Sequence, residues 1–372
     1  MKKIAVGISG GVDSSVAALI LKKAGFDVIA VFMNNWDSYI NNDFLGNDSI
    51  QKKDGCNSIE DFQFAKLICE KLEIPLYKVE FIKEYWENVF KPFIESYKKG
   101  ITPNPDVLCN QHIKFGYFLN YCINNLHCDY VATGHYAGVR KNKQGYYELV
   151  ESFDTKKDQT YFLCNLNQNQ LSKTIFPLEL LTKEMVRSIA KKYNLDTWNK
   201  KDSTGICFIG ERNFKKFLGN YINNNVGDIV DIKTNKVIGK HNGIHLYTIG
   251  QRKSLNLGGH LNRHFVCSKD VEKNILYVTD IENEQKFLFS KKCYIKNFNW
   301  ISIPPKSNEV ELRFRHTQTK INGNFKILDN KSVELYYPQS SKSVTEGQYA
   351  VLYKNGICLG GGEISYVLHG ID

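Results

Sequence analysis

Short apolar runs alternate with segments of helical periodicity along the first half of the chain. Residues 4–8 form such a run, Ser9-Gly10-Gly11 follow it, and apolar residues then recur at helical spacing until Gly25. A continuous apolar run of this kind is typical of a strand buried on both faces. The alternation predicts a doubly wound parallel α/β sheet, which further includes strands over 28–33, 76–81 and 129–133 and a helix over 58–72.

The pattern changes beyond about residue 212, where short alternating runs replace helical periodicity. In 310–315 the apolar residues fall on one face and the charges on the other, as in a half-buried antiparallel strand. The runs 350–353 and 357–359 flank an Asn-Gly pair at 355–356, which is a strong hairpin signal. We therefore expect two small β-rich domains after the α/β domain, the last of them a β-barrel.

The length of 372 residues suits two or three domains, which we expect at 1–212, 213–283 and 284–372. The formal net charge is +10, and it is unevenly placed. Lys and Arg exceed Asp and Glu by 27 to 25 in the first domain, ten to six in the second and twelve to eight in the third. This excess favours a polyanion such as nucleic acid as the partner of the last two domains. A Lys- and Asn-rich composition would give the same excess without a function.

No apolar run approaches the roughly 18 residues of a membrane span. Lys2-Lys3 leads into too few apolar residues for a signal peptide. The ten cysteines are scattered, with no CxxC pair and no Cys/His quartet at zinc spacing. We therefore expect a cytoplasmic protein without a membrane partner or a bound metal, in which most cysteines, such as Cys69, Cys122 and Cys128, are reduced and buried.

The segment Ser9-Gly10-Gly11-Val12-Asp13-Ser14 lies between a predicted strand and a predicted helix. Glycines there allow close approach to the backbone, and free N–H groups at a helix start attract phosphates. The segment is neither a Walker A loop nor a GxGxxG loop, and it resembles the SGGxDS loop of the ATP pyrophosphatase (PP-loop) superfamily. Met33 and Gly134 end or follow other predicted strands at the same edge, where open α/β sheets bind ligands.

Two cysteines lie in contexts that favour reactivity. Asp106 is expected to be the N-cap of a helix, which would place Cys109 in its first turn. Because a helix N-terminus lowers the pKa of a thiol from about 8.5, Cys109 is a candidate thiolate with Asp106 near it as an acid or base. Cys207 lies in a predicted loop between Gly205 and Gly210, where an accessible thiol could react.

Six segments, in the same order along the chain, resemble the family of bacterial tRNA-specific 2-thiouridylases. They are Ser9 to Ser14, Thr102-Pro103-Asn104-Pro105-Asp106 with Cys109-Asn110, Ala132-Thr133-Gly134-His135-Tyr136, Lys157-Asp158-Gln159-Thr160-Tyr161-Phe162-Leu163, Gly205-Ile206-Cys207-Phe208-Ile209-Gly210 and Tyr247-Thr248-Ile249-Gly250-Gln251-Arg252.

The resemblance implies ATP-dependent 2-thiolation of the wobble uridine of tRNA, with AMP and pyrophosphate as by-products. It also implies Mg²⁺ with the ATP, contact with the tRNA anticodon loop, and a persulfide donor protein or cysteine desulfurase relay as sulfur source. Cys207 would carry the persulfide, and Cys109 would be the nucleophile that forms a transient disulfide with it. The implied positions are Gly7, Ile8, Ser9, Gly10, Gly11, Val12, Asp13, Ser14, Met33 and Gly134 for ATP, Asn104, Pro105 and Asp106 for the target base, and His135, Lys157, Asp158, Gln159, Phe314, Arg315 and Gln348 for tRNA.

Three other functions remain open at this point. An amide-forming ligase, such as an argininosuccinate or GMP synthetase, would use the same ATP loop without needing two loop cysteines. Asp106, Cys109 and Cys207 would alternatively be ligands of an iron–sulfur cluster or a metal. A non-catalytic RNA-binding module would use ATP only as a switch.

Overall fold

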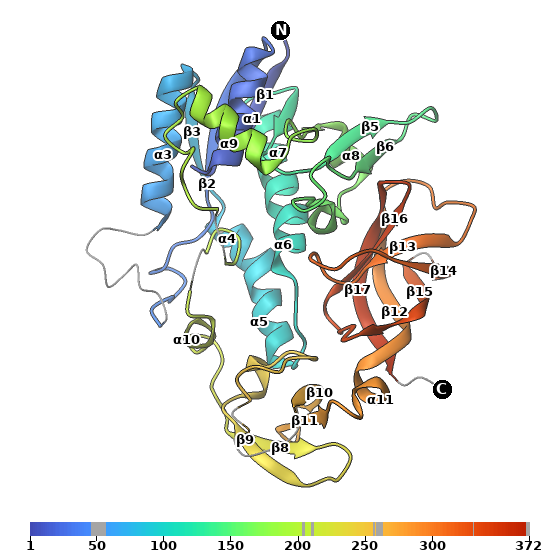
Figure 1. The fold of residues 1–372 in the computed structure, drawn as a ribbon. Coiled ribbons are helices and arrows are strands. Elements are labelled where there is room, and N and C mark those ends of the chain that lie inside the picture. Colours follow the sequence, from blue (N-terminus) through green and yellow to red (C-terminus); the bar gives the residue numbers. More distant parts are fainter. Residues whose placement is uncertain are drawn as a thin grey trace.

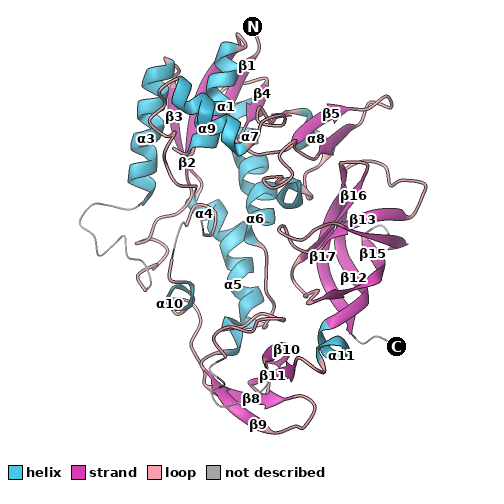
Figure 2. Ribbon diagram, viewed as in Figure 1, coloured by secondary structure: helices cyan, strands magenta, loops and turns pink. Residues whose placement is uncertain are grey.

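The computed structural model describes residues 1–45, 57–202, 205–209, 212–255, 257, 263–329 and 331–369. Its strands form three sheets, which follow one another along the chain with a single exception (Figures 1 and 2). In Figure 1 the first sheet lies at the top left, the middle sheet at the bottom and the last sheet on the right. Gly210 of the Cys207 segment and Cys56 lie outside the described residues.

The first sheet has five parallel strands, because its buried apolar runs can be covered by helices on both faces. In β1, Ile4 and Val6 face one hydrophobic core and Ala5 faces the other. The strand order is β3 (Leu76–Glu80), β2 (Asp27–Asn34), β1 (Lys3–Gly7), β4 (Tyr130–Ala132) and β7 (Thr174–Ile175). The order reverses between β1 and β4, and open α/β sheets bind ligands outside the carboxyl ends of the strands at such a reversal.

Helices on both faces complete this domain and confirm the predicted doubly wound architecture. One core contains side chains of α1 (Val12–Lys23), α3 (Asn57–Leu72) and α9 (Lys183–Lys192). The other contains the helices that run down the centre of Figure 1. These are α4 (Ile82–Tyr85), a π-helix (Trp86–Phe90), α5 (Lys91–Lys98), α6 (Pro105–Leu108), a second π-helix (Cys109–Tyr117) and α7 (Phe118–Asn124), with the short elements η3 (Thr160–Leu163) and α8 (Gln168–Ser172) nearby.

The middle sheet has four strands in the order β10 (His264–Asp270), β11 (Ile275–Asp280), β8 (Gly227–Asp231) and β9 (Val237–His241). Its small core includes Ile229, Val266 and Leu276. The short helix α10 (Phe214–Leu218) precedes this sheet, η4 (Ile244–Leu246) follows β9, and α11 (Glu284–Leu288) leads to the last sheet.

The last sheet closes on itself as a six-stranded barrel, which confirms the predicted barrel. β12 (Phe289–Trp300) pairs with β15 (Ser332–Lys342) on one side and with β17 (Ile357–His369) on the other, and β14 (Ile321–Asp329), β13 (Glu309–Arg313) and β16 (Tyr349–Lys354) complete the ring. The predicted hairpin is also confirmed, since Asn355 and Gly356 join β16 to β17 with φ values of 52° and 76°.

One hairpin departs from the sequential arrangement of the sheets. β5 (Gly138–Lys141) and β6 (Tyr147–Val150) belong by sequence to the first domain, but β6 pairs with the start of β17. Leu149 faces Cys358 across this pairing. The N-terminal domain therefore contributes two strands to the sheet of the barrel.

Candidate functional site

The loop after β1 forms a compact turn at the start of α1. Gly10 has a φ of +72°, and a Cβ there would lie 2.2 Å from the Asp61 carbonyl oxygen, so only glycine fits. The Ser14 hydroxyl accepts a hydrogen bond from Ser9 N–H at 3.2 Å and donates to the Gly11 carbonyl. No described side chain caps the N-terminus of α1, so its first N–H groups are available to an anion.

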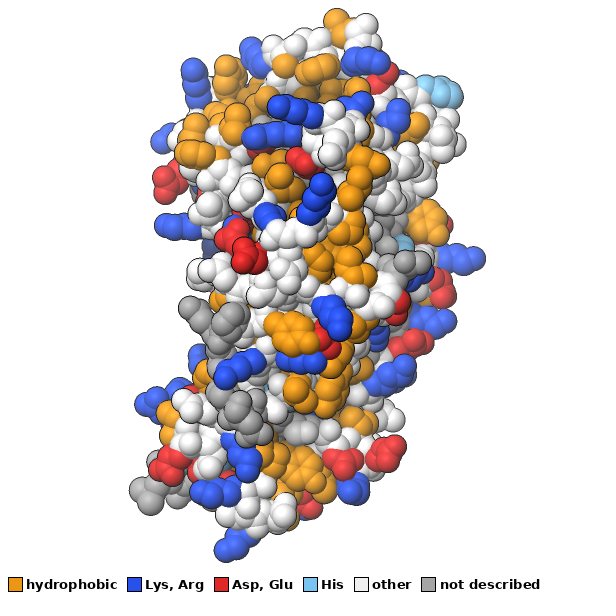
Figure 3. Space-filling view, turned by 90° about the vertical axis from the view of Figure 1, so that its right-hand side faces the viewer, with side chains coloured by type: hydrophobic (Ala, Val, Ile, Leu, Met, Phe, Trp, Pro, Cys, Tyr) orange, Lys and Arg blue, Asp and Glu red, His pale blue; other side chains and the backbone are white. Residues whose placement is uncertain are grey.

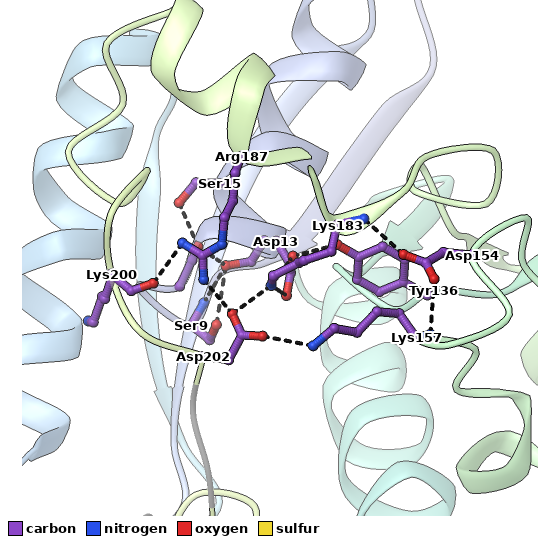
Figure 4. Close-up of polar contacts among 12 residues, drawn as sticks. Ser9, Asp13, Ser15, Tyr136, Asp154, Lys157, Lys183, Arg187, Lys200 and Asp202 are labelled. Carbon is purple, nitrogen blue, oxygen red and sulfur yellow. Dashed lines mark hydrogen bonds and ion pairs between the residues drawn. The ribbon is translucent and has the colours of Figure 1, made fainter. Parts of the chain in front are cut away.

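A charged cluster lies beside this loop (Figure 4). Lys183 Nζ lies 2.8 Å from both carboxylate oxygens of Asp13 and 2.8 Å from Asp202 Oδ1. Arg187 and Lys157 contact Asp202 at 2.7 and 2.9 Å. Burial opposes ionisation of Asp202, but the hydrogen bonds from Lys183 and Lys157 outweigh it and hold its pKa at about 2. Three cations therefore gather beside the glycine loop with two carboxylates between them.

Met33 and Gly134, which the sequence placed at the same sheet edge, do meet the glycine loop. A Cβ at Gly7 would lie 3.4 Å from the Met33 Cε atom. A Cβ at Gly134 would lie 2.7 Å from Ser14 N, so β4 approaches the loop backbone as closely as glycine permits. Met33 of β2 and Gly134 after β4 thus flank the end of β1 from opposite sides.

The helix that carries Cys109 begins earlier than the sequence suggested. Asn104 is the N-cap, Pro105 is the first helical residue and Asp106 the second, so the prediction of an Asp106 cap is wrong. Proline suits the first position because its missing N–H has no partner to lose there. Cys109 consequently lies beyond the first turn, and the helix continues from it through the π-helical segment to α7.

The structure brings the two singled-out cysteines together. Cys109 Sγ lies 3.5 Å from Cys207 Sγ, and the Cys109 thiol donates a hydrogen bond to Cys207. Cys109 is fully buried, whereas Cys207 is half-buried above it. Phe208, the next residue, has a φ of +67°, which is rare for a bulky side chain and marks a strained turn at this point.

The two thiols have opposite acidities. The hydrogen bond from Cys109 lowers the pKa of Cys207 against the effect of burial, and the Lys114 charge lowers it further. Burial, and then the hydrogen bond to Cys207, raise the pKa of Cys109 well above its ordinary value. Cys207 is therefore the more acidic thiol in this structure, and Cys109 lies beyond the first turn whose N–H groups were expected to lower its pKa.

Sequence reasoning missed two side chains beside this pair, Lys114 and Tyr85, and assigned a third one nearby, His135, to tRNA contact. The Lys114 charge lowers the pKa of Cys207, and the Tyr85 hydroxyl donates to the Cys207 carbonyl at 2.8 Å. The His135 ring lies 3.5 Å from Lys114 Nζ through its Nε2 atom. Burial raises the pKa of the Asp106 carboxyl, and the nearby Cys207 backbone and Lys114 charge offset part of that rise. In the sequence, the family resemblance and a position after a predicted strand marked His135, whereas nothing marked Lys114 or Tyr85.

The loop before the helix is held by all three parts of the molecule. From the barrel, Gln348 Nε2 donates to the carbonyls of Thr102 and Pro103 at 2.8 and 3.3 Å. From the middle sheet, Lys269 Nζ donates to the Gly100 carbonyl at 2.8 Å, and burial lowers its pKa to about 8. Asn104 and Asp106 thus follow a loop whose position depends on both β-rich parts.

The positions that the resemblance assigns to tRNA differ in exposure. Arg315 is exposed, and Lys157, Gln159 and Gln348 are half-buried. The side chains of Asp158, Phe314 and His135 are buried, and Asp158 instead forms an ion pair with Arg313 of the barrel at 3.3 Å. Figure 3 shows the barrel side of the molecule, where Lys and Arg are spread along the face among hydrophobic, Asp and Glu side chains.

The remaining described cysteines are free, and Cys69, Cys122 and Cys128 are buried as predicted. In the ranges that the structure covers, no three His, Cys, Asp or Glu side chains gather at metal-binding distance. Among the described helices, none is both long and apolar enough to cross a bilayer.

Family models match three consecutive parts of the chain. They are described as a tRNA methyl transferase HUP domain over residues 2–211, a tRNA methyl transferase PRC-barrel domain over 215–280 and an aminomethyltransferase beta-barrel domain over 290–364.

Curated relatives match over nearly the full length. The tRNA-specific 2-thiouridylase MnmA of Malacoplasma penetrans is 58% identical over 98% of each chain, and that of Mycoplasma mycoides subsp. mycoides is 54% identical over 99% of each. Likeness to solved structures is remote. A 4-thiouridine synthetase in complex with RNA and ATP has a TM-score of 0.34 and 13% identity, over 59% of this chain and 50% of that one. The NMN synthetase of Francisella tularensis has a TM-score of 0.32 and 18% identity, over 54% and 66%.

Proposed function

The chain belongs to the family of tRNA-specific 2-thiouridylases, and on this premise we propose that it replaces the C2 oxygen of the wobble uridine of tRNA by sulfur. ATP activates that oxygen by transferring AMP to it and releasing pyrophosphate. The observation that carries the proposal is the contact of Cys109 with Cys207 at 3.5 Å, beside Asp106. Neither methyl transfer nor amide formation requires two thiols at this distance.

The glycine loop and the charged cluster support ATP as the activating substrate. The uncapped start of α1 offers N–H groups to phosphates, and Lys157, Lys183 and Arg187 offer positive charge. Asp13 and Asp202 supply carboxylate oxygens of the type that Mg²⁺ prefers, so the residues present fit a magnesium ion. Mg²⁺ would neutralise phosphate charge there.

Exposure of the two cysteines supports the division of labour between them. Half-buried Cys207 can receive a sulfur atom from an external persulfide donor, whereas fully buried Cys109 can reach only Cys207. The terminal sulfur of the Cys207 persulfide attacks C2, the bond from C2 to the adenylated oxygen breaks, and AMP leaves. Cys109 then loses its proton, for which Asp106 is the candidate base, and attacks Cys207 Sγ, so that a Cys109–Cys207 disulfide forms and the 2-thiouridine sulfur is released. Hydrosulfide release before attack on C2 would use the same bonds in another order.

The electron balance of these steps shows which other reactants the cycle needs. One persulfide sulfur is reduced as two thiols are oxidised, so a reductant has to restore both thiols before the next turnover. A persulfide donor protein is therefore required as a partner, and a reducing compartment such as the cytoplasm suits the cycle.

Binding of tRNA involves all three parts of the molecule. We assign the domains to residues 1–212, 213–283 and 284–372, of which the last two carry most of the positive excess. The loop that leads to Asn104, Pro105 and Asp106 would meet the splayed target base, because an unpaired base must leave its stack to reach a catalytic pocket. Arg315 and Lys157 are the accessible cations among the tRNA positions.

Nucleoside mass spectrometry tests the proposal directly. Purified chain, ATP, a persulfide donor and unmodified tRNA should yield wobble uridine that has exchanged one oxygen for sulfur, with equal amounts of AMP and pyrophosphate. Absence of exchange while the donor is active on a known acceptor would refute it. ATP-dependent product formation by a Cys109→Ser, Cys207→Ser double variant would favour the ligase alternative. Iron-free, colourless protein that still thiolates would exclude the cluster alternative.

A further inference from the structure

The helix that carries Cys109 also carries Lys114, and it is wider than an α-helix over the segment that joins them. In an α-helix, residues five positions apart point about 140° away from each other. Here the segment Cys109–Tyr117 is a π-helix, and the Phe118 N–H bonds to the Ile113 carbonyl, five residues back. The wider turn places Lys114 on the face that carries Cys109, and π-helical segments of this kind occur frequently at functional sites.

The half-buried Lys114 side chain extends among sulfur and aromatic groups. Its Nζ atom lies 3.5 Å from His135 Nε2 and 5.8 Å from the centre of the ring of Phe208, the residue that follows Cys207. The Lys114 charge lowers the pKa of Cys207. None of the ion pairs between described residues involves Lys114. Its charge therefore acts mainly on the two sulfur atoms, with Asp106 as the nearby carboxylate.

We propose that Lys114 is a further catalytic residue, whose ammonium group holds the sulfur of Cys207 in its anionic form, as a thiolate before loading and as a persulfide anion afterwards. The inference deepens the proposed thiolation, on which its catalytic part rests.

Both steps require an anionic sulfur. During loading, the Cys207 thiolate attacks the terminal sulfur of the donor persulfide, one S–S bond forms as another breaks, and a thiolate leaves on the donor. During transfer, the terminal sulfur of the Cys207 persulfide is the nucleophile toward C2. A cation beside Cys207 favours each anion over its protonated form, and a desolvated site strengthens the attraction.

The neighbours of Lys114 suit this role. Burial, and then the Lys114 charge, lower the pKa of His135 well below its ordinary value, so the ring is neutral at pH 7. Neutral His135 accepts from Lys114 at Nε2 and contacts the Thr133 hydroxyl, 2.7 Å away, at Nδ1. The other titratable groups facing the pair are Asp106, whose charge opposes a thiolate, Tyr85, whose pKa burial raises, and His316, which acts on Asp106.

Alkylation of Cys207 by iodoacetamide, mapped by peptide mass spectrometry across pH without tRNA or ATP, tests the inference. Lys114→Met should slow alkylation of Cys207 at pH 7 about tenfold, which corresponds to one unit of thiol pKa, and Lys114→Arg should restore it. Lys173→Met removes a half-buried lysine elsewhere in the same domain and should leave the profile unchanged. An unchanged profile in folded Lys114→Met would overturn the inference.

Two further measurements keep the test decisive. If Lys114→Met does not fold, the pH dependence of Cys207 alkylation in the unsubstituted chain tests the inference instead. A midpoint at or above the ordinary cysteine pKa of about 8.5 would overturn it. With persulfide preloaded on Cys207, Lys114→Met should thiolate tRNA about tenfold more slowly in a single turnover, and an equal rate would contradict a catalytic role. If the unsubstituted chain does not thiolate tRNA, the proposed function fails, whereas the alkylation result still reports on Lys114.

Discussion

The Sγ atoms of Cys109 and Cys207 lie 3.5 Å apart although 98 residues separate them in the chain. The bond between them is expected only during turnover, since both are free thiols in this structure. Cys207→Ser should abolish both sulfur loading and tRNA thiolation. Cys109→Ser should still accept one sulfur atom on Cys207, because the half-buried Cys207 keeps its own thiol, but should not complete turnover through a disulfide. Intact-protein mass spectrometry and nucleoside analysis would distinguish the two variants, and equal loading defects in both would contradict the division of roles.

Asp106→Asn should stabilise the fold while it lowers activity. Burial raises the pKa of Asp106 above 3.8, so the unfolded chain releases this proton at a lower pH than the folded one. The free energy of unfolding therefore falls as the pH rises from about 4 through the pKa of the folded chain. At pH 7 the whole destabilisation by the Asp106 charge is present. Asn keeps an acceptor for the Cys207 backbone and removes the charge. Urea unfolding should show that Asp106→Asn raises the free energy of unfolding at pH 7 and leaves it unchanged near pH 3.5. An increase of the same size at both pH values would contradict this explanation.

Asp158→Ala should destabilise the junction between the first domain and the barrel. Asp158 is buried, accepts from Ser152 N–H and the Thr160 hydroxyl, and pairs with Arg313 at 3.3 Å. Removing one partner of a buried pair leaves the other charge desolvated, which costs about 3 kcal/mol or more. Glu87→Ala, which breaks the exposed Lys91–Glu87 pair, should cost less than about 1 kcal/mol. Similar unfolding free energies for the two variants would favour a role for Asp158 in tRNA contact alone.

Lys183→Met should weaken ATP binding by roughly 10- to 100-fold, since a charge-assisted hydrogen bond contributes about 1.5–3 kcal/mol. The variant also leaves Asp13 and Asp202 without the ammonium group between them, so their repulsion of phosphates adds to the loss. Lys192→Met, on the exposed side of the same helix, is the matched control. Calorimetric titration with ATP measures both, and equal affinities would place the triphosphate away from this cluster.

The sequence was informative wherever local pattern determines structure. Buried parallel strands are continuous apolar runs, and the Asn355-Gly356 turn needs two residues that tolerate positive φ, so both were predictable. The N-cap was misplaced because Asp106 and Asn104 are both good caps, and the position of Pro105 between them decided the outcome.

The rest of the site depends on packing between distant segments. No periodicity marks the π-helix that brings Lys114 to Cys109, since the same apolar residues would suit an α-helix. Gln348 reaches Thr102 across 246 residues, and neither neighbourhood carries a signal for the other. The resemblance implied that Gln348 contacts tRNA, whereas in this structure its side-chain amide donates hydrogen bonds to the loop before Asp106.

The pairing of β6 with β17 means that the barrel cannot be excised along its sequence boundary. A fragment starting at residue 284 would leave behind Leu149 and Val150, which cover Cys358 and Ile357 at the start of β17. Its exposed strand edge would invite intermolecular pairing and precipitation. Fragment studies and chimeras of this family would therefore need to transplant the 138–150 hairpin together with the barrel, as one exchangeable unit.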